Sequence, residues 1–243
     1  MKSITLVKIG GIFGIFLGVL NVIAFFFGFG SYVPAMMLQL YVQMMVNYYT
    51  FDIVFYILTG IFWILFALAI IIHSKLYGSK IGGTTGAIAC TTGLFAFEIG
   101  ILLLCIIQNQ DVSVLKKIIP YSIFVLFCYE IFLFIFGIFI IPYFVKIHKK
   151  LGIIGGILLI ISGIPSLFMT IIIYGVLASN NLFTLVPYKL HEVINPFAML
   201  ALLAFIIFSA VIVLLLRTIG LILCGISTFR FREEEKTATI KVS

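Results

Sequence analysis

Long apolar runs alternate with short polar clusters along the whole chain. Six runs stand out, and each is long enough to cross a bilayer, since a helix needs roughly 20 apolar residues to span the hydrocarbon. They extend approximately over residues 9–29, 53–72, 81–107, 118–145, 151–178 and 197–216. Hydrocarbon offers no hydrogen-bonding partner, so the backbone must satisfy itself inside helices, and the runs lack the alternation of barrel strands. The pattern predicts an all-α, polytopic transmembrane helical bundle of about six spans.

The first and last runs set the limits of the predicted transmembrane domain. The first is too long for the apolar part of a secretory signal, and no small-residue cleavage site precedes Pro34, so we expect it to be retained. The last can continue through 218–229, either as a longer tilted helix or as a bend along the membrane surface. The transmembrane domain is therefore predicted over residues 1–229, followed by a cytoplasmic tail over 230–243.

Composition supports the membrane class. Of the 243 residues, 64% are hydrophobic and 9% are charged, whereas a soluble domain carries about 25% charged residues on its wetted surface. The net charge of +7 comes from short basic clusters between apolar runs. That placement is typical of cytoplasmic membrane loops and argues against nucleic-acid binding.

The distribution of Lys and Arg predicts an orientation. If both termini are cytoplasmic, the outer loops contain only Lys116, Lys117 and Lys189 of the 15 basic residues, and the other twelve lie on the cytoplasmic side. Basic residues concentrate in cytoplasmic loops. We therefore predict a multi-pass protein of the cell membrane with cytoplasmic N- and C-termini.

A short motif recurs at the start of the first, third and fifth runs. It reads K-[I/L]-G-x-x-x-G, with a small or polar residue seven positions later. The motif glycines and the later positions are Gly10, Gly14 and Asn21, then Gly82, Gly86 and Gly93, then Gly152, Gly156 and Gly163. Small residues at this spacing let helix backbones approach closely. The sequence is compatible with three tandem two-helix hairpin repeats, or with chance in a glycine-rich apolar chain.

Two carboxylates lie inside the runs at similar predicted depth, Glu98 in the third and Glu130 in the fourth. Charged groups at the centre of a span cost about 2.5–3.5 kcal/mol, so we expect both to face the bundle interior and each other. A polar stripe at seven-residue spacing runs through Thr84, Thr91, Glu98 and Cys105. With Gly86, Gly93 and Gly100 on another side of the same helix, this stripe predicts a third span surrounded by protein. The pair is either part of a proton or cation path that includes Thr91 and Asn21, or a hydrogen-bonded contact between helices.

Other polar positions are interpreted more simply. The connection from Ser31 to Asp52, with its Tyr and Met residues, predicts an interfacial or re-entrant helix after Pro34 rather than a copper site. His73 and His148 end two runs in basic turns, which favours interfacial charge over haem ligation. Arg217 is expected to extend to the inner surface. The four cysteines have no metal-ligand spacing and are read as packing residues, so no metal or cofactor is predicted.

The motifs of common enzyme classes are missing from the sequence. It contains no Walker A loop, HExxH, GxSxG or dinucleotide-binding fingerprint. We therefore expect a non-enzymatic subunit or organiser of a membrane assembly, in contact with the lipid bilayer and with other membrane subunits or further copies of itself. The alternative is a small transporter or channel whose path includes Glu98 and Glu130. An enzyme acting on lipids or quinones is the third possibility.

Overall fold

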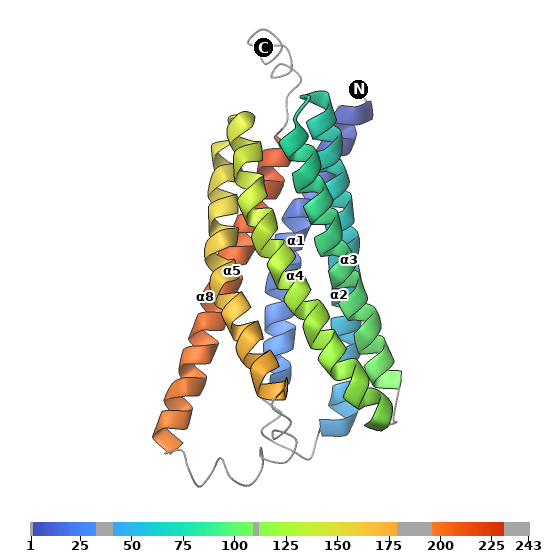
Figure 1. The fold of residues 1–243 in the computed structure, drawn as a ribbon, viewed down its shortest axis with the longest axis vertical. Helices are drawn as coiled ribbons and strands as arrows, with labels where there is room; N and C mark the ends of the chain where they lie inside the picture. Colours follow the sequence, from blue (N-terminus) through green and yellow to red (C-terminus); the bar gives the residue numbers. More distant parts are fainter. Residues whose placement is uncertain (1, 33–40, 109–111, 179–195, 231–243) are drawn as a thin grey trace.

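The computed structural model describes residues 2–32, 41–108, 112–178 and 196–230, and within these ranges the regular secondary structure is helical throughout. Six long helices cross the molecule (Figure 1). They are α1 (Lys2–Tyr32), α2 (Tyr41–Leu76), α3 (Lys80–Gln108), α4 (Val112–Lys146), α5 (Lys150–Ala178) and α8 (Pro196–Phe229). Each is long and apolar enough to cross a membrane. The predicted all-helical bundle with six spans is confirmed.

Two predictions about boundaries can be compared with these helices. The sixth helix continues to Phe229, which agrees with the longer of the two predicted forms. The separate interfacial helix predicted between Ser31 and Asp52 is wrong from Tyr41 onward, because those residues form the first turns of α2. The part of that prediction over 33–40, like the tail over 231–243, lies outside the described residues.

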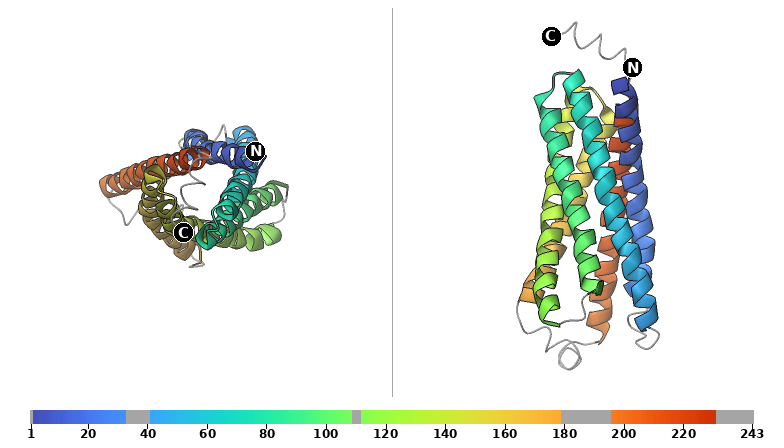
Figure 2. Two further views of the ribbon diagram at one scale, coloured as in Figure 1. Left: turned by 90° about the horizontal axis from the view of Figure 1, so that it is seen from above. Right: turned by 90° about the vertical axis from the view of Figure 1, so that its right-hand side faces the viewer.

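The helices form a closed ring in chain order. Each packs against the next along the chain, and α8 packs against both α5 and α1, which closes the ring. A view along the bundle axis shows the helices arranged around a common centre (Figure 2, left). The N-terminus, Phe229 and the two short turns at 77–79 and 147–149 lie at the same end of the bundle (Figure 1), which we call the termini end.

Aromatic side chains fill the centre of the ring. Trp63 and Phe66 of α2 meet Phe136 of α4, with ring centroids 5.0 Å and 6.2 Å apart, and all three side chains are fully buried. Further large, fully buried apolar side chains come from five of the helices: Leu17, Ile70, Leu133, Ile140, Phe144, Leu159 and Leu221. Dense packing of this kind replaces the hydrophobic effect as the source of association among helices in lipid.

Glycines bring the helices closest together where the ring closes. A Cβ built on Gly14 would lie 2.9 Å from the Cα of Gly225, and one on Gly225 would lie 2.5 Å from the backbone N of Ile15. A side chain at either position would force α1 and α8 apart. The other motif glycines pack on a neighbouring even-numbered helix: Gly10, Gly82, Gly86 and Gly93 on α2, and Gly152, Gly156 and Gly163 on α4.

The turns after α2 and α4 have the same backbone geometry. Gly78 and His148 adopt positive φ values of 63° and 54°. In the first turn the N–H of Ser79 donates to the carbonyl of Ser74, and in the second the N–H of Lys149 donates to that of Phe144. Both are Schellman motifs, in which a left-handed residue ends the helix. The first turn connects α2 to α3 and the second connects α4 to α5, with glycine in the left-handed position of one and histidine in that of the other.

Candidate functional site

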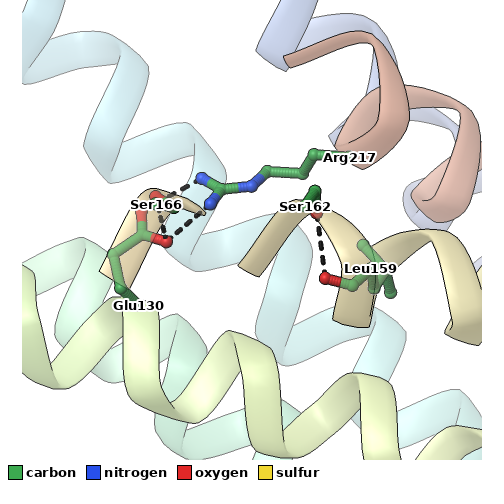
Figure 3. Close-up of polar contacts among 5 residues, drawn as sticks. All are labelled: Glu130, Leu159, Ser162, Ser166 and Arg217. Atoms are coloured by element: carbon green, nitrogen blue, oxygen red, sulfur yellow. Dashed lines mark hydrogen bonds and ion pairs between the residues drawn. The ribbon is translucent and has the colours of Figure 1, made fainter. Parts of the chain in front are cut away.

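An ion pair joins α4 to α8 in the interior of the ring. The Arg217 guanidinium donates from one terminal nitrogen to Glu130 Oε1 at 3.0 Å and from the other to Oε2 at 2.5 Å. Ser166 of α5 donates its hydroxyl to the same Oε2 at 2.8 Å (Figure 3). The two charged side chains are only 11% and 7% exposed. This two-pronged geometry is the strongest form of an arginine–carboxylate contact.

The pair lies deep in the membrane-spanning part of the bundle. Glu130 precedes the end of α4 at Lys146 by sixteen residues, and Arg217 precedes Phe229 by twelve. At 1.5 Å per residue these positions are roughly 24 Å and 18 Å from the termini end. The prediction that Arg217 extends to the inner surface is therefore wrong. Its side chain points across the ring to Glu130, the carboxylate with which it forms the ion pair.

Because the pair is buried, each of the two charged side chains depends on the other for its stability. Removing either charge from water is costly, and the mutual attraction offsets that cost only while both are present. Tyr129 of α4 and Tyr56 of α2 are close enough to Arg217 to interact with it electrostatically. Ser162, one turn from Ser166 on α5, instead donates to the carbonyl of Leu159 (Figure 3). The site is thus a neutral ion pair with one further hydrogen bond from the Ser166 hydroxyl of α5.

Glu98 has a different partner. Tyr121 of α4 donates its hydroxyl to Glu98 Oε1 at 2.6 Å. Tyr121 and Glu130 are nine residues apart on one helix, and at 100° per residue they lie on opposite sides of it. Glu98 therefore sits at the α3–α4 boundary and Glu130 on the side of α4 that meets α5 and α8. The predicted face-to-face pairing of the two carboxylates is wrong, since matched depth does not determine which side of α4 each one meets.

The polar stripe of α3 faces away from the ring. Glu98 is nine residues from Ala89, which is fully buried, so the two lie on opposite sides of the helix. Thr84 is exposed, Thr91 is half-buried, and both donate to carbonyls of their own helix. The glycine stripe does pack on α2. Of the two stripes expected to be covered by protein, the glycine stripe is buried, whereas among the described residues the polar stripe is half-buried at Thr91, Glu98 and Cys105 and exposed at Thr84. A role for Thr91, Glu98 and Glu130 in a proton or cation path stays a prediction.

His73 is buried rather than interfacial. Its side chain is 2% exposed, and its Nδ1 is hydrogen-bonded to the hydroxyl of Tyr143 on α4. The prediction of an interfacial charge is wrong for His73, because Tyr143 reaches it across the ring. The same prediction is compatible with His148, whose side chain is exposed. Asn21 donates to the carbonyl of Leu17 within its own helix. Among the described residues, no group of three or more His, Cys, Asp or Glu side chains could hold a metal ion.

Sequence reasoning missed the partner of Glu130 because the shorter of its two forms for the sixth span ended at Leu216. A span over 197–216 puts Arg217 just beyond the membrane. The apolar stretch that ends at Phe229 is longer than one span requires, and a window ending at Phe229 would have put Arg217 inside. The extra length of this apolar stretch was the feature of the sequence that could have placed Arg217 inside the membrane.

No family model, curated protein or solved structure matches this chain. The class of protein therefore rests on its own fold and site. The six apolar helices define a multi-pass helical membrane protein, and the deep Glu130–Arg217 pair distinguishes its interior.

Proposed function

We propose that this protein is a non-enzymatic subunit or organiser of a membrane assembly. The observation that carries the proposal is the filled centre of the ring. Trp63, Phe66 and Phe136 occupy the middle of the bundle between the ion pair and the termini end, and none is exposed. A polar path through the ring would need hydrated groups where these aromatic side chains lie.

The ion pair supports the same proposal. Each oxygen of Glu130 accepts from Arg217, and Ser166 adds a third hydrogen bond. A carboxylate held this way has few remaining positions for a passing ion. The pair instead ties α4, α5 and α8 together where hydrocarbon gives little drive for association. We assign it a structural role in closing the ring.

The orientation and the internal repeat belong to this proposal. We place both termini in the cytoplasm on the distribution of Lys and Arg. We also interpret the chain as three tandem hairpins, supported by the K-[I/L]-G-x-x-x-G motifs and by the matching Schellman turns at Gly78 and His148. Repeated hairpins of one orientation would be related by an axis along the membrane normal.

Two measurements on the native protein test the assembly role. Extraction of membranes in a mild detergent, followed by native mass measurement, should give a defined complex larger than one copy of the chain. The purified chain reconstituted in liposomes should carry no proton or cation flux above that of protein-free liposomes. A single copy that conducts ions would contradict the proposal.

A transporter is the second candidate, and one observation favours it. The Nε of Arg217 is buried without a hydrogen-bond partner among the described residues. Buried donors of this kind usually bind water. Water beside Arg217 could bring protons to Glu130, and intramembrane charges commonly mark such paths. Proton flux in liposomes that is lost in Glu130→Gln but kept in Ser162→Ala would favour this function.

A further inference from the structure

The outer face of α3 carries a continuous polar stripe, which we call the α3 stripe. It consists of Thr84, Thr91, Glu98 and Cys105, spaced seven residues apart, with Tyr121 of α4 beside Glu98. Tyr121 is 49% exposed. The apolar side chains around the stripe, Leu94, Ile101 and Phe124, are 56%, 43% and 51% exposed. Thr84 is exposed and Thr91, Glu98 and Cys105 are half-buried, so the stripe lies at a surface that the described residues leave partly open.

Glu98 is incompletely paired on this surface. One of its oxygens accepts from Tyr121, a neutral donor, and the described residues supply no cation to it. Arg217, the arginine inside the span of α8, is bound to Glu130 on the other side of α4. A half-buried carboxylate at the edge of the bundle is unfavourable in lipid, and such residues normally turn toward protein or pair with an opposite charge. The described residues provide no such charge, and a basic side chain on a partner helix would supply it.

We infer that the α3 stripe is the contact surface for a transmembrane helix of a partner protein that carries a Lys or Arg at the depth of Glu98. The seven-residue spacing is the repeat at which two helices remain in contact while crossing at about +20°. Threonine side chains at such positions permit close approach and can hydrogen-bond across the contact. The inference rests on the proposed assembly role and specifies the surface that serves it.

The negative charge of Glu98 favours a different protein over a second copy of this chain as the partner that binds the α3 stripe. Two copies related by an axis along the membrane normal would bring Glu98 against Glu98 at one depth. Like carboxylates at contact distance disfavour each other's ionised form. A basic side chain instead completes the Glu98–Tyr121 pair with a charge-assisted hydrogen bond. The partner that we infer is therefore a basic membrane helix of another protein. Self-association through Glu98 is the alternative that the experiment must distinguish from it.

Synthetic membrane-spanning peptides test the inference with the full-length protein. A Leu/Ala peptide of about 22 residues with one Lys at the depth of Glu98 is compared with the same peptide without Lys. Both are labelled, and their association with the labelled protein in liposomes is measured by energy transfer. The Lys peptide should bind, and Glu98→Gln should weaken it about three- to fifteen-fold. Ile161→Ala, at a 48% exposed position on α5, is the matched control and should leave binding unchanged.

The other outcomes overturn the inference. If the Lys peptide binds wild type and Glu98→Gln equally, or binds no better than the peptide without Lys, the stripe does not recognise a basic helix. Self-association that depends on Glu98 would replace the partner protein with a second copy. If native complexes persist in Glu98→Gln at unchanged size, the assembly role stands and this surface does not serve it. If the native protein is always a single copy, the proposed assembly role is itself contradicted.

Discussion

Glu130 and Glu98 are the two carboxylates of the membrane-spanning core, and α4 separates their surroundings. Glu130 lies inside the ring and receives three hydrogen bonds, two of them from a guanidinium. Glu98 lies on the outer face and receives one, from a phenol. Depth in the membrane is therefore a poor guide to the role of a charge. The side of the helix that it occupies determines whether the chain can neutralise it.

The comparison predicts different consequences for stability. The inner pair should be essential to this chain alone, because it is desolvated and connects helices that are distant in the sequence. The outer pair should matter little to the isolated chain and more to its partners. Four substitutions, taken from the largest expected effect to the smallest, separate these roles.

Removing one charge of the inner pair should have the largest effect. Glu130→Leu leaves Arg217 buried without a counter-charge, and such losses cost about 3–5 kcal/mol. The free energy of unfolding can be measured by titrating micelles with a denaturing detergent. The double variant Glu130→Leu/Arg217→Met should recover most of the loss, since neither charge then remains. Equal losses in the single and double variants would mean that the charges do not interact.

Loss of the hydroxyl that supports the pair should have an intermediate effect. Ser166→Ala removes one donor to Glu130 Oε2 and leaves the guanidinium in place. We expect the free energy of unfolding to fall by about 1 kcal/mol in the same titration. Ser162→Ala is the control, because that hydroxyl donates only to its own helix. A larger loss at Ser162 than at Ser166 would argue against a supporting role for Ser166.

Neutralising the outer carboxylate should hardly change the isolated chain. Glu98→Gln keeps an acceptor for Tyr121 and places no charge on the outer face. The free energy of unfolding should stay within about 0.5 kcal/mol of the wild-type value. A loss comparable with that of Glu130→Leu would show that Glu98 is part of the structural core, contrary to its position on the outer face.

Tyr121→Phe should have the smallest effect on unfolding. The side chain is half exposed, and its hydroxyl donates a single hydrogen bond, to Glu98. The unfolding midpoint should equal that of wild type within error. The same variant should weaken association with the Lys peptide, because the phenol positions Glu98. A fall in the midpoint as large as that of Ser166→Ala would remove the contrast between the two carboxylates.

Much of the fold could be read from local pattern. A run of about 20 apolar residues must become a helix in hydrocarbon, because a helix satisfies its backbone hydrogen bonds within one segment. This requirement predicted the six helices, and the polar clusters between the runs predicted the short turns after α2 and α4. The exception was the segment after Pro34, where polar aromatic residues suggested a separate interfacial helix although Tyr41 begins α2.

The partners of the charged residues were decided by tertiary structure. Glu130 and Arg217 are 87 residues apart, and their contact depends on α8 returning to close the ring between α5 and α1. Local periodicity shows that a helix has a polar side, but it does not show which neighbour that side will meet. The sequence by itself determined that the chain must cross the membrane in helices. Ring closure decided that one carboxylate gains an arginine inside while the other is left at the outer face, because only packing sets the rotation of each helix relative to the rest.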